Sequence, residues 1–348
     1  MNTSKIESIG LGGSIQVNNL TVGANVQIGN RVKIKCDHLI IGDNVQILDD
    51  VEIVAYEAEL GFNVKIEERV KIIREGAYFS VGENTFIGHD CKFTVPRLLI
   101  GEYATINNHC MFSGNEPLLL GHNAWIGQNC VLNSQQKLTI GNNFGLGMYS
   151  CVYTHGYFGE LLEGCNIHKE EEVNIADDVW VLGQFNMISP GVNIENKALI
   201  LNGTNVTSNV KSNSTVGGNP SKDLTDKLVP YKEIKISDKL NLMRKFISEW
   251  LKKNYNITTH FDNEIDIKDI GRIVIIDKPT TEFSPSTVII CTSHLDYIKN
   301  APNNVSIFDL NTKVYYKTRS KIEIDFIRFM KSYRARFVPN DNSRILLK

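Results

Sequence analysis

The chain of 348 residues contains no stretch of 18 uninterrupted apolar residues, so we expect no membrane-spanning helix. Its first ten residues lack the charged and then apolar pattern of a secretory signal, and we therefore expect a cytoplasmic protein. The formal net charge is only −2 at pH 7, which argues against a globally basic nucleic-acid binder. The length indicates two domains.

Neither cysteine nor histidine shows the spacing of a metal or redox motif. No C-x-x-C pair occurs, and no two histidines lie four or five residues apart, so we expect no metal site. Cys91, Cys110, Cys130 and Cys151 are instead 19, 20 and 21 residues apart. We expect these four to stack at one inward position, where a free cysteine acts as a small apolar side chain.

An internal repeat organises the first two thirds of the chain. An apolar residue, a small or acidic residue and then a polar residue recur in steps of 19, 19, 21, 19, 20, 20, 35 and 19. Aliphatic residues also return every six positions within many units, as at Ile41, Ile47 and Ile53. The recurring pairs are Val22-Gly23, Ile41-Gly42, Leu60-Gly61, Val81-Gly82, Ile100-Gly101, Leu120-Gly121, Ile140-Gly141, Ile175-Ala176 and Ile194-Glu195.

Three steps of six residues make one turn of a triangular prism, with a short strand on each face and the extra residues at the corners. Each turn buries its aliphatics against the turns above and below it. Glycine and asparagine at the corners tolerate left-handed backbone angles. The repeat therefore predicts a mainly β fold, a parallel β-helix. His89, His109 and His122 fall at or near corners, where we expect ordinary surface histidines.

The repeat is interrupted once, by an irregular loop at about residues 156–174. Tyr153-Thr154-His155 ends the turn before the loop, and Trp180 lies on the first turn after it. A histidine is the side chain best suited to remove a proton from an attacking alcohol or amine near neutral pH. We therefore expect His155 to be a catalytic base.

Further motifs follow in a fixed order after the loop: residues 175–180 (IADDVW), 189–192 (SPGV) and 216–222 (VGGNPSK). Over roughly residues 120–224, this order resembles the hexapeptide-repeat acyltransferases, of the galactoside and maltose acetyltransferase type and the polysaccharide O-acetyltransferases. The resemblance implies a left-handed β-helix and acetyl-CoA as the acyl donor. It also implies a homotrimer whose active sites lie between neighbouring prisms.

The resemblance also implies roles for individual residues. Trp180 is expected to line the site or donate its indole N–H, although Trp125 holds the same place in a turn without a loop, which leaves a plain packing role open. Leu182 stands where relatives have a glycine, so the amide that would face the reacting carbonyl is left open. The residues expected to bind the donor are Gly183, Gln184, Gly203, Thr204, Lys211 and Lys222.

Three residues are candidates for binding the acceptor. Asn133 lies one turn before His155, although an ordinary corner asparagine is an equal alternative. Tyr157 and His168 lie in the interrupting loop, where His168 is otherwise explained as an ordinary loop residue. No single one of these three defines the acceptor.

The repeat ends after Pro220, so we expect a β-helix domain over residues 1–224 and a small α+β domain over residues 225–348. Apolar spacing predicts helices at Asp238–Asn254 and Ile322–Phe337. Short β-branched runs predict strands at 273–276, 288–291, 305–308 and 313–316. From Thr312 to Lys348 the net charge is +7, which indicates either a solvated face or a docking surface for an anionic acceptor or membrane.

Together these features predict a cytoplasmic acetyl-CoA-dependent O-acetyltransferase that acts on a carbohydrate, in capsule or other surface polysaccharide synthesis. The acceptor is a carbohydrate, with an anionic polysaccharide as one form of it. The first alternative is an N-acetyltransferase for an amino-sugar nucleotide. The second is a non-catalytic β-helix that acts as a scaffold. Thioester turnover by the purified protein separates these alternatives.

Overall fold

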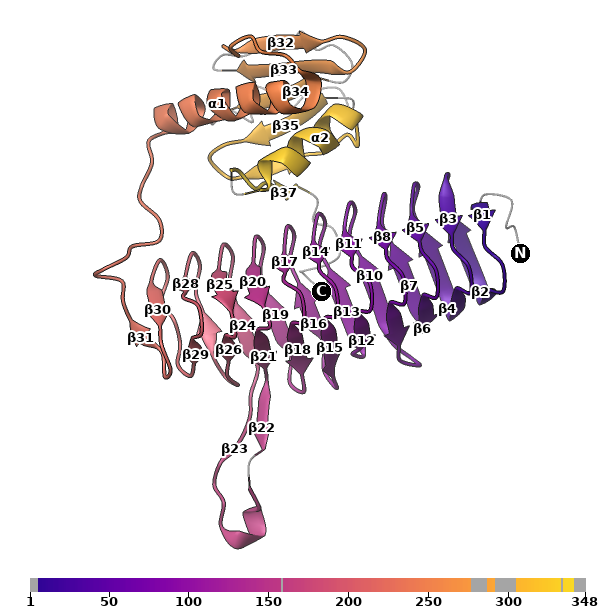
Figure 1. Cartoon of the computed structure of the whole chain (residues 1–348), viewed down its shortest axis with the longest axis vertical. Coiled ribbons are helices and arrows are strands. Elements are labelled where there is room, and N and C mark those ends of the chain that lie inside the picture. The colour runs from indigo at the N-terminus through magenta and orange to yellow at the C-terminus, as the bar shows by residue number, and fades with distance from the viewer. Residues whose placement is uncertain (1–5, 158, 277–286, 292–304, 333, 341–348) are drawn as a thin grey trace. The chain divides into compact units, whose positions relative to one another are not determined.

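The computed structural model describes residues 6–157, 159–276, 287–291, 305–332 and 334–340 (Figure 1). The chain divides into two compact units between Tyr231 and Lys232. The first unit is a parallel β-solenoid, and the second combines helices with a small sheet. In the described part of the chain, no helix has both the length and the apolar character needed to cross a membrane.

Each coil of the solenoid contributes strands to three parallel ladders, which we call faces one, two and three in the order in which the chain visits them. Face one contains β1 (Ile6–Ile9), β3 (Val26–Ile28), β5 (Gln46–Ile47), β8 (Lys65–Ile66), β11 (Phe86–Ile87), β14 (Thr105–Ile106), β17 (Trp125–Ile126), β20 (Gly145–Met148), β25 (Trp180–Gln184), β28 (Leu199–Ile200) and β30 (Thr215–Gly217). Face two contains β6 (Glu52–Val54), β9 (Lys71–Ile73), β12 (Lys92–Thr94), β15 (Met111–Gly114), β18 (Val131–Ser134), β21 (Cys151–Tyr153), β26 (Met187–Ile188) and β29 (Asn205–Val206). Face three contains β7 (Glu57–Leu60), β10 (Tyr78–Val81), β13 (Arg97–Ile100), β16 (Leu118–Leu120), β19 (Leu138–Ile140), β24 (Val173–Ile175) and β27 (Asn193–Ile194).

Three strands depart from this pattern. β2 (Ser14–Val22) and β4 (Lys33–Ile41) run continuously from face two into face three and pair with each other along their length. β31 (Lys222–Asp223) pairs with β30 in the antiparallel direction, at the end of face one. The corners are numbered in the same order as the faces. The first corner joins faces one and two, the second joins faces two and three, and the third joins faces three and one.

The core is a set of aliphatic columns that run through the coils. Ile87, Ile106, Ile126 and Leu146 are neighbours in register on face one, and each is fully buried. Burying one such side chain stabilises a protein by roughly 1.5–3 kcal/mol. The predicted β-helix with inward aliphatics is therefore confirmed, and its repeat reflects the spacing of buried columns.

Residues with left-handed backbone angles form two of the corners. Asn123 and Asn143 have φ values of 58° and 60° at successive third corners, and the Asn123 amide donates to Asn143 Oδ1 at 3.1 Å. Asparagine tolerates this conformation better than most side chains. The glycines of the repeat serve another purpose, since a Cβ at Gly121 would collide with the backbone at Gly141. Close contact between coils therefore requires the small residue of each repeat unit.

Charged residues alternate along the first corner. Arg31 donates two hydrogen bonds of 2.6 Å to the carboxylate of Asp50, one coil later. Arg69 likewise donates two of 2.8 Å to the carboxylate of Asp90. All four residues have φ between 55° and 61°, so they occupy equivalent corner positions. The corner is thus a ladder of opposite charges.

Three of the four repeat-spaced cysteines stack as expected. Cys91, Cys110 and Cys130 are at most 1% exposed, and their thiols donate to the carbonyls of Asn107, Gly127 and Gly147 at 3.0–3.2 Å. The fourth expectation was wrong. Cys151 pairs with Val131 on the strand and is only half-buried. The fully buried Ser150 takes the place expected for it, and its carbonyl accepts the hydrogen bond from the Val131 amide. The coil before Cys151 is 20 residues long, so a spacing of 21 shifts its side chain by one position.

In its described residues, the second unit contains a six-stranded sheet with three central parallel strands. Its strands are β32 (Glu264–Ile267), β33 (Gly271–Ile276), β34 (Thr287–Cys291), β35 (Val305–Asp309), β36 (Val314–Tyr316) and β37 (Val338–Pro339), and its helices are α1 (Ile236–Tyr255) and α2 (Lys321–Met330). The helix expected to reach Phe337 ends earlier, because Val338 and Asn340 donate backbone hydrogen bonds to Lys313 and Tyr315. Pairing with β36 overrides the helical pattern there.

Candidate functional site

The interrupting loop forms a β-hairpin that leaves the solenoid at the second corner (Figure 1). Its strands are β22 (His155–Tyr157) and β23 (His168–Glu170), and a short 3-10 helix, Leu161–Glu163, lies between them. Cross-strand pairing places His155 opposite Glu170 and Tyr157 opposite His168. The hairpin therefore gathers four chemically active side chains at its base.

Aromatic rings surround His155. Its ring centroid lies 5.0 Å from that of Tyr157 and 6.2 Å from that of Tyr153. The ring of His168 stacks on Tyr157 at 4.6 Å. His155 is half-buried, and its Nδ1 atom is buried without a hydrogen-bond partner in the described chain. Since buried polar atoms are nearly always satisfied, this nitrogen is available for a ligand or a further group.

Glu170 completes the cluster, and the sequence analysis missed it. Its carboxylate accepts a 2.5 Å hydrogen bond from the Tyr157 hydroxyl and a 3.0 Å bond from the Gln136 amide. The Tyr157 bond, followed by the Gln136 bond, lowers the pKa of Glu170, with smaller effects from His168 and His155. The same bond raises the pKa of Tyr157. His155 and Glu170 are about equally far in sequence from the middle of the interrupting loop. Such symmetry places two residues opposite each other in a hairpin, and it was the signal available in the sequence.

Asn133 lies directly beneath the hairpin base. It pairs in register with Tyr153, and its carbonyl accepts the Thr154 amide at 3.3 Å. Its own side-chain amide donates to Ser113 Oγ at 3.2 Å. Asn133 thus lies one coil before the base of the hairpin that carries Tyr157 and His168.

Trp180 lies elsewhere on the solenoid, at the start of face one after the third corner. It pairs with Gly145, and its ring covers the space that a side chain at Gly145 would need. Gly145 in turn pairs with Trp125 on the preceding coil. The two tryptophans therefore flank one glycine, and each occupies the equivalent strand position.

A β-bulge follows Trp180. Register with β20 runs from Leu146 opposite Val181 to Met148 opposite Gln184, so β25 has one extra residue. Leu182 points outward at 38% exposure, and its carbonyl accepts a 2.8 Å bond from the buried Asn186 side chain. Bulges of this kind redirect a strand and are frequent beside functional sites.

The candidate donor-binding residues lie mainly along the first corner beyond this bulge. Gly183 has a φ of 65° and Gly203, one coil later, has a φ of 68° with open space around its Cα. Gln184 contacts that coil, since its carbonyl accepts the Gly203 amide at 3.0 Å. Thr204 is 1% exposed, and its hydroxyl donates to the Leu201 carbonyl at 2.5 Å. Thr204 therefore shapes the corner from inside.

The two candidate lysines do not share one position. Lys222 is exposed on β31, opposite Gly217. Lys211 is exposed near the last of the third corners. Hydrogen bonds from Thr225 chiefly lower the pKa of the Asp223 carboxyl, and the nearby charge of Lys211 adds to this effect. Only Lys222 extends the run of small residues at Gly203 and Gly217.

Within one chain, the predicted site is thus divided. His155 and the acceptor candidates surround the second corner, whereas Gly183, Gln184 and Gly203 lie at the first, and Trp180 follows the third. Exposed apolar side chains gather near the first corner, where Tyr149 stacks on Phe185 at 5.5 Å. We call six exposed residues around this corner the apolar stripe: Met111, Met148, Tyr149, Leu182, Phe185 and Met187.

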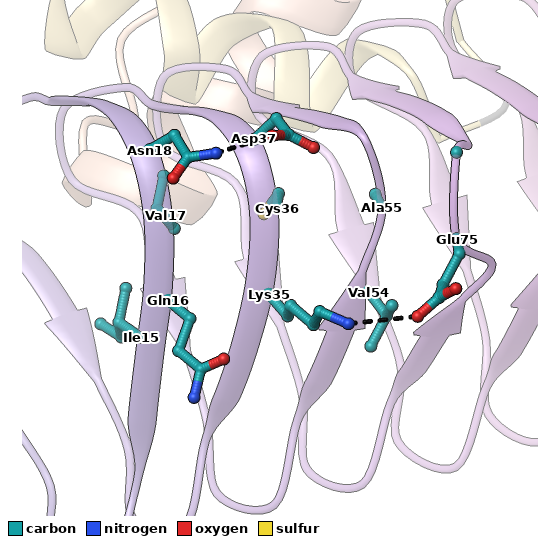
Figure 2. A pocket seen from close by; sticks show the side chains of 11 residues that line it. Ile15, Gln16, Val17, Asn18, Lys35, Cys36, Asp37, Val54, Ala55 and Glu75 are labelled. Atoms are coloured by element: carbon teal, nitrogen blue, oxygen red, sulfur yellow. Dashed lines mark hydrogen bonds and ion pairs between the residues drawn. The ribbon is translucent and has the colours of Figure 1, made fainter.

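A separate groove of about 570 Å³ opens on the first coils, where β2 and β4 run straight between faces (Figure 2). Asn18 donates to Asp37 at 2.7 Å, and Lys35 pairs with Glu75 at 3.1 Å across the groove. These polar groups are already paired with one another. The groove is several coils from His155 and contains none of the predicted site residues.

No protein-family model matches the chain. Among solved structures it is similar to galactoside acetyltransferase in complex with coenzyme A, at 22% identity over 42% of this chain and 68% of that chain, with a TM-score of 0.33. It is also similar to the polysialic acid O-acetyltransferase OatWY, at 17% identity over 66% and 93%, with a TM-score of 0.28. A third is AntD, an N-acyltransferase from Bacillus cereus in complex with dTDP and 3-hydroxybutyryl-CoA, at 16% identity over 49% and 89%, with a TM-score of 0.36. These likenesses concern the repeating architecture alone.

Proposed function

We propose that the chain is a cytoplasmic acetyl-CoA-dependent O-acetyltransferase that acts on a carbohydrate hydroxyl. The observation that carries this proposal is the cluster at the hairpin base. There a partly exposed histidine, with one ring nitrogen unpartnered, lies between aromatic rings and opposite a carboxylate. Aromatic faces and polar edges of this kind suit a sugar ring, which has both apolar and hydroxyl surfaces.

In the proposed reaction, His155 takes the proton of the acceptor hydroxyl as its oxygen attacks the thioester carbonyl. The C–S bond then breaks, and the proton passes from His155 to the leaving thiolate of coenzyme A. General-base catalysis of this type contributes roughly 10²–10⁴-fold. The negative charge of Glu170, on the facing strand, stabilises His155 while it holds the proton.

The donor side of the proposed site uses the small residues of the first corner. Gly203 has open space beside its Cα, which suits an extended pantetheine chain, whereas the side chain of Asn202 packs against Gly183 on the preceding coil. Lys222 lies at the end of this run and would face the phosphates. The bulge at Leu182 and Gly183 supplies backbone N–H groups of altered direction, and such groups can stabilise a developing oxyanion.

We also propose that the active unit is a homotrimer with its sites between copies. The donor candidates and His155 lie at different corners of one prism, so a second copy is needed to bring them together. The apolar stripe supports this, because soluble proteins rarely leave large apolar patches uncovered. Light scattering on the purified chain tests the assembly, and a fully active monomer contradicts it.

The net charge of +7 over residues 312–348 of the C-terminal unit overstates the support for an anionic polysaccharide acceptor, because some of these basic side chains are paired or buried. Arg334 pairs with Glu249 at 3.2 Å and lies 4.0 Å from the Phe329 ring centroid. Burial lowers the pKa of Lys331 to about 8, with Arg336 and Arg328 adding to the effect. Arg319, Lys321 and Arg328 are exposed, so electrostatic steering of an acidic polymer would involve these residues.

Release of free coenzyme A from acetyl-CoA tests the proposal directly, with neutral oligosaccharides, polysialic acid and amino-sugar nucleotides as acceptors. We expect acceptor-dependent release with a carbohydrate hydroxyl and none without acceptor beyond slow hydrolysis. Release only with an amino-sugar nucleotide identifies an N-acetyltransferase instead. No release and no acetyl-CoA binding would leave a scaffold as the better explanation.

A further inference from the structure

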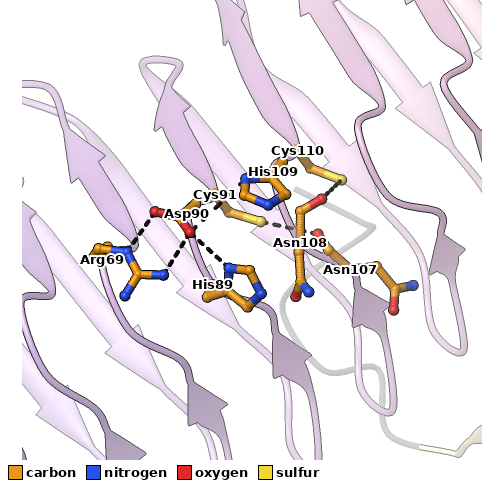
Figure 3. A network of polar contacts seen from close by, with 8 residues as sticks. All are labelled: Arg69, His89, Asp90, Cys91, Asn107, Asn108, His109 and Cys110. Carbon is orange, nitrogen blue, oxygen red and sulfur yellow. Dashed lines mark hydrogen bonds and ion pairs between the residues drawn. The ribbon is translucent and has the colours of Figure 1, made fainter.

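Two histidines separated by one coil meet at the first corner, far along the chain from the hairpin. The rings of His89 and His109 contact edge to face, with centroids 5.0 Å apart and an interplanar angle of 89°. Asp90 lies beside both rings, with Oδ2 2.7 Å from His89 Nδ1 and 4.0 Å from His109 Nδ1 (Figure 3). A search for histidines four or five residues apart misses this pair, because the relevant spacing in a solenoid is one coil.

The backbone fixes this arrangement before any ligand binds. The His109 amide donates to the His89 carbonyl at 3.1 Å, and the Asp90 amide donates to Glu68 on the previous coil at the same distance. Arg69 holds the Asp90 carboxylate through both oxygens at 2.8 Å. A carboxylate offers about four lone-pair positions, so Oδ2 can still face the histidines.

We propose that His89, Asp90 and His109 bind a divalent transition-metal cation, such as Zn²⁺. Ligand atoms of the three side chains all lie within 4.8 Å of one another. Metal–ligand bonds of about 2.0–2.1 Å in a tetrahedral site place ligand atoms about 3.3 Å apart, so small rotations of the rings complete the site. Two imidazoles and one carboxylate form a donor set that suits zinc, nickel and copper more than calcium or magnesium.

The local charge and exposure fit such an ion. The guanidinium of Arg69 is opposed by Glu68 and Asp50 as well as by Asp90, so it does not leave the corner positively charged. The side chains of His89, His109 and Asp90 are 30%, 51% and 30% exposed, which leaves the open side of the site to water. Arg69 acts as an outer partner that orients the carboxylate, as outer-shell groups do in known metal sites.

The proposed ion would add a direct link between two successive coils at a corner where the side chains already meet by ring contact, ion pairing and hydrogen bonds. A ligand that binds the folded chain and not the unfolded one stabilises it by mass action. The site therefore acts as a staple within the solenoid and does not depend on the proposed acetyl transfer at the hairpin.

The test is isothermal titration of the chelator-treated full-length protein with Zn²⁺, paired with thermal unfolding at increasing Zn²⁺ concentration. We expect one equivalent per chain and a rising unfolding temperature. His89→Asn and His109→Asn are gentle variants, because Asn108 and Asn129 occupy the equivalent corner positions on the next coils. Each is expected to weaken binding more than about tenfold, since even outer-shell losses cost 10–100-fold.

His260→Asn, an exposed histidine in the second unit, is the matched control and should bind like the parent. A His155→Asn, His168→Asn double variant distinguishes the hairpin as the source of any zinc binding. Failure of the parent to bind one equivalent would overturn the proposal. Retention of parental affinity by both corner variants would overturn it as well, as would loss of binding only in the hairpin variant.

Discussion

The first and second corners of the solenoid both hold histidines, but the surroundings of these histidines differ. At the first corner the chain keeps its period, and His89 and His109 meet side chains supplied by adjacent coils. At the second corner the period breaks after Thr154, and His155 leaves the prism with a buried nitrogen that no described residue satisfies. The regular corner therefore supplies its histidines with contacts from neighbouring coils, whereas the interrupted corner leaves one ring nitrogen of His155 available to a ligand.

The largest effect is expected from His155→Gln, which removes the base but keeps a polar side chain of similar size. If the interrupted corner carries the chemistry, turnover falls by roughly 10²–10⁴-fold. Acetyl-CoA binding should stay largely intact, because the donor candidates lie at another corner. Steady-state rates and equilibrium binding of acetyl-CoA measure the two quantities separately.

His109→Gln is the counterpart at the regular corner and should leave turnover close to that of the parent. A loss for His155→Gln of less than about fivefold, well short of the general-base range, would mean that the base lies elsewhere. Equal losses in both variants would remove the contrast between the corners.

Leu146→Ala tests the core beneath both corners. Leu146 is fully buried on face one, in register with Ile126 and Val181. Truncation of a buried leucine costs about 2–5 kcal/mol of unfolding free energy. Chemical denaturation measures this loss, and Leu182→Ala, at an exposed position one residue past Val181, is the control that should change far less.

Tyr157→Phe tests the hydrogen bond that joins the hairpin strands to Glu170. That bond lowers the pKa of Glu170, so its stabilising effect is present above the unfolded pKa, about 4.3, and is lost as pH falls through the folded value. We expect the variant to unfold at a lower temperature than the parent at pH 7, with the difference shrinking below pH 4. A difference that is constant from pH 7 to pH 3 would contradict this origin.

The smallest effect is expected from Asp50→Asn in the charge ladder. Its hydrogen bonds to Arg31 are short, but both side chains are more than a third exposed. Exposed ion pairs contribute little to stability and are weakened by salt. Denaturation at low and high salt measures this effect, and a loss as large as that of Leu146→Ala would show the ladder to be a main source of stability.

The solenoid was predictable because each of its requirements leaves a periodic mark in the sequence. Inward columns demand aliphatic residues every six positions, and close coils demand glycine at positions such as Gly121. The predicted cysteine column was wrong only at Cys151, because Cys151 follows Cys130 by 21 residues whereas that coil is 20 residues long. Single-residue changes in coil length therefore limit register prediction.

The candidate site was less predictable, since its parts depend on pairing that has no period. The loop itself was evident, but its hairpin register decides that Glu170 faces His155. In the second unit, the helix predicted to reach Phe337 ended at Met330 because Val338 pairs with β36. Such long-range strand pairing is set by the whole unit and not by local spacing.

The reversed direction of β31 has a consequence for self-association. A parallel ladder exposes unpaired backbone groups at each end, and another coil of the same kind could add there and extend the solenoid into a fibre. β31 occupies the end of face one in the antiparallel sense, and Thr215 next to it donates its hydroxyl to the Leu228 carbonyl at 2.6 Å. That edge of face one is thereby covered by the chain's own backbone, which opposes the addition of a second solenoid at this end.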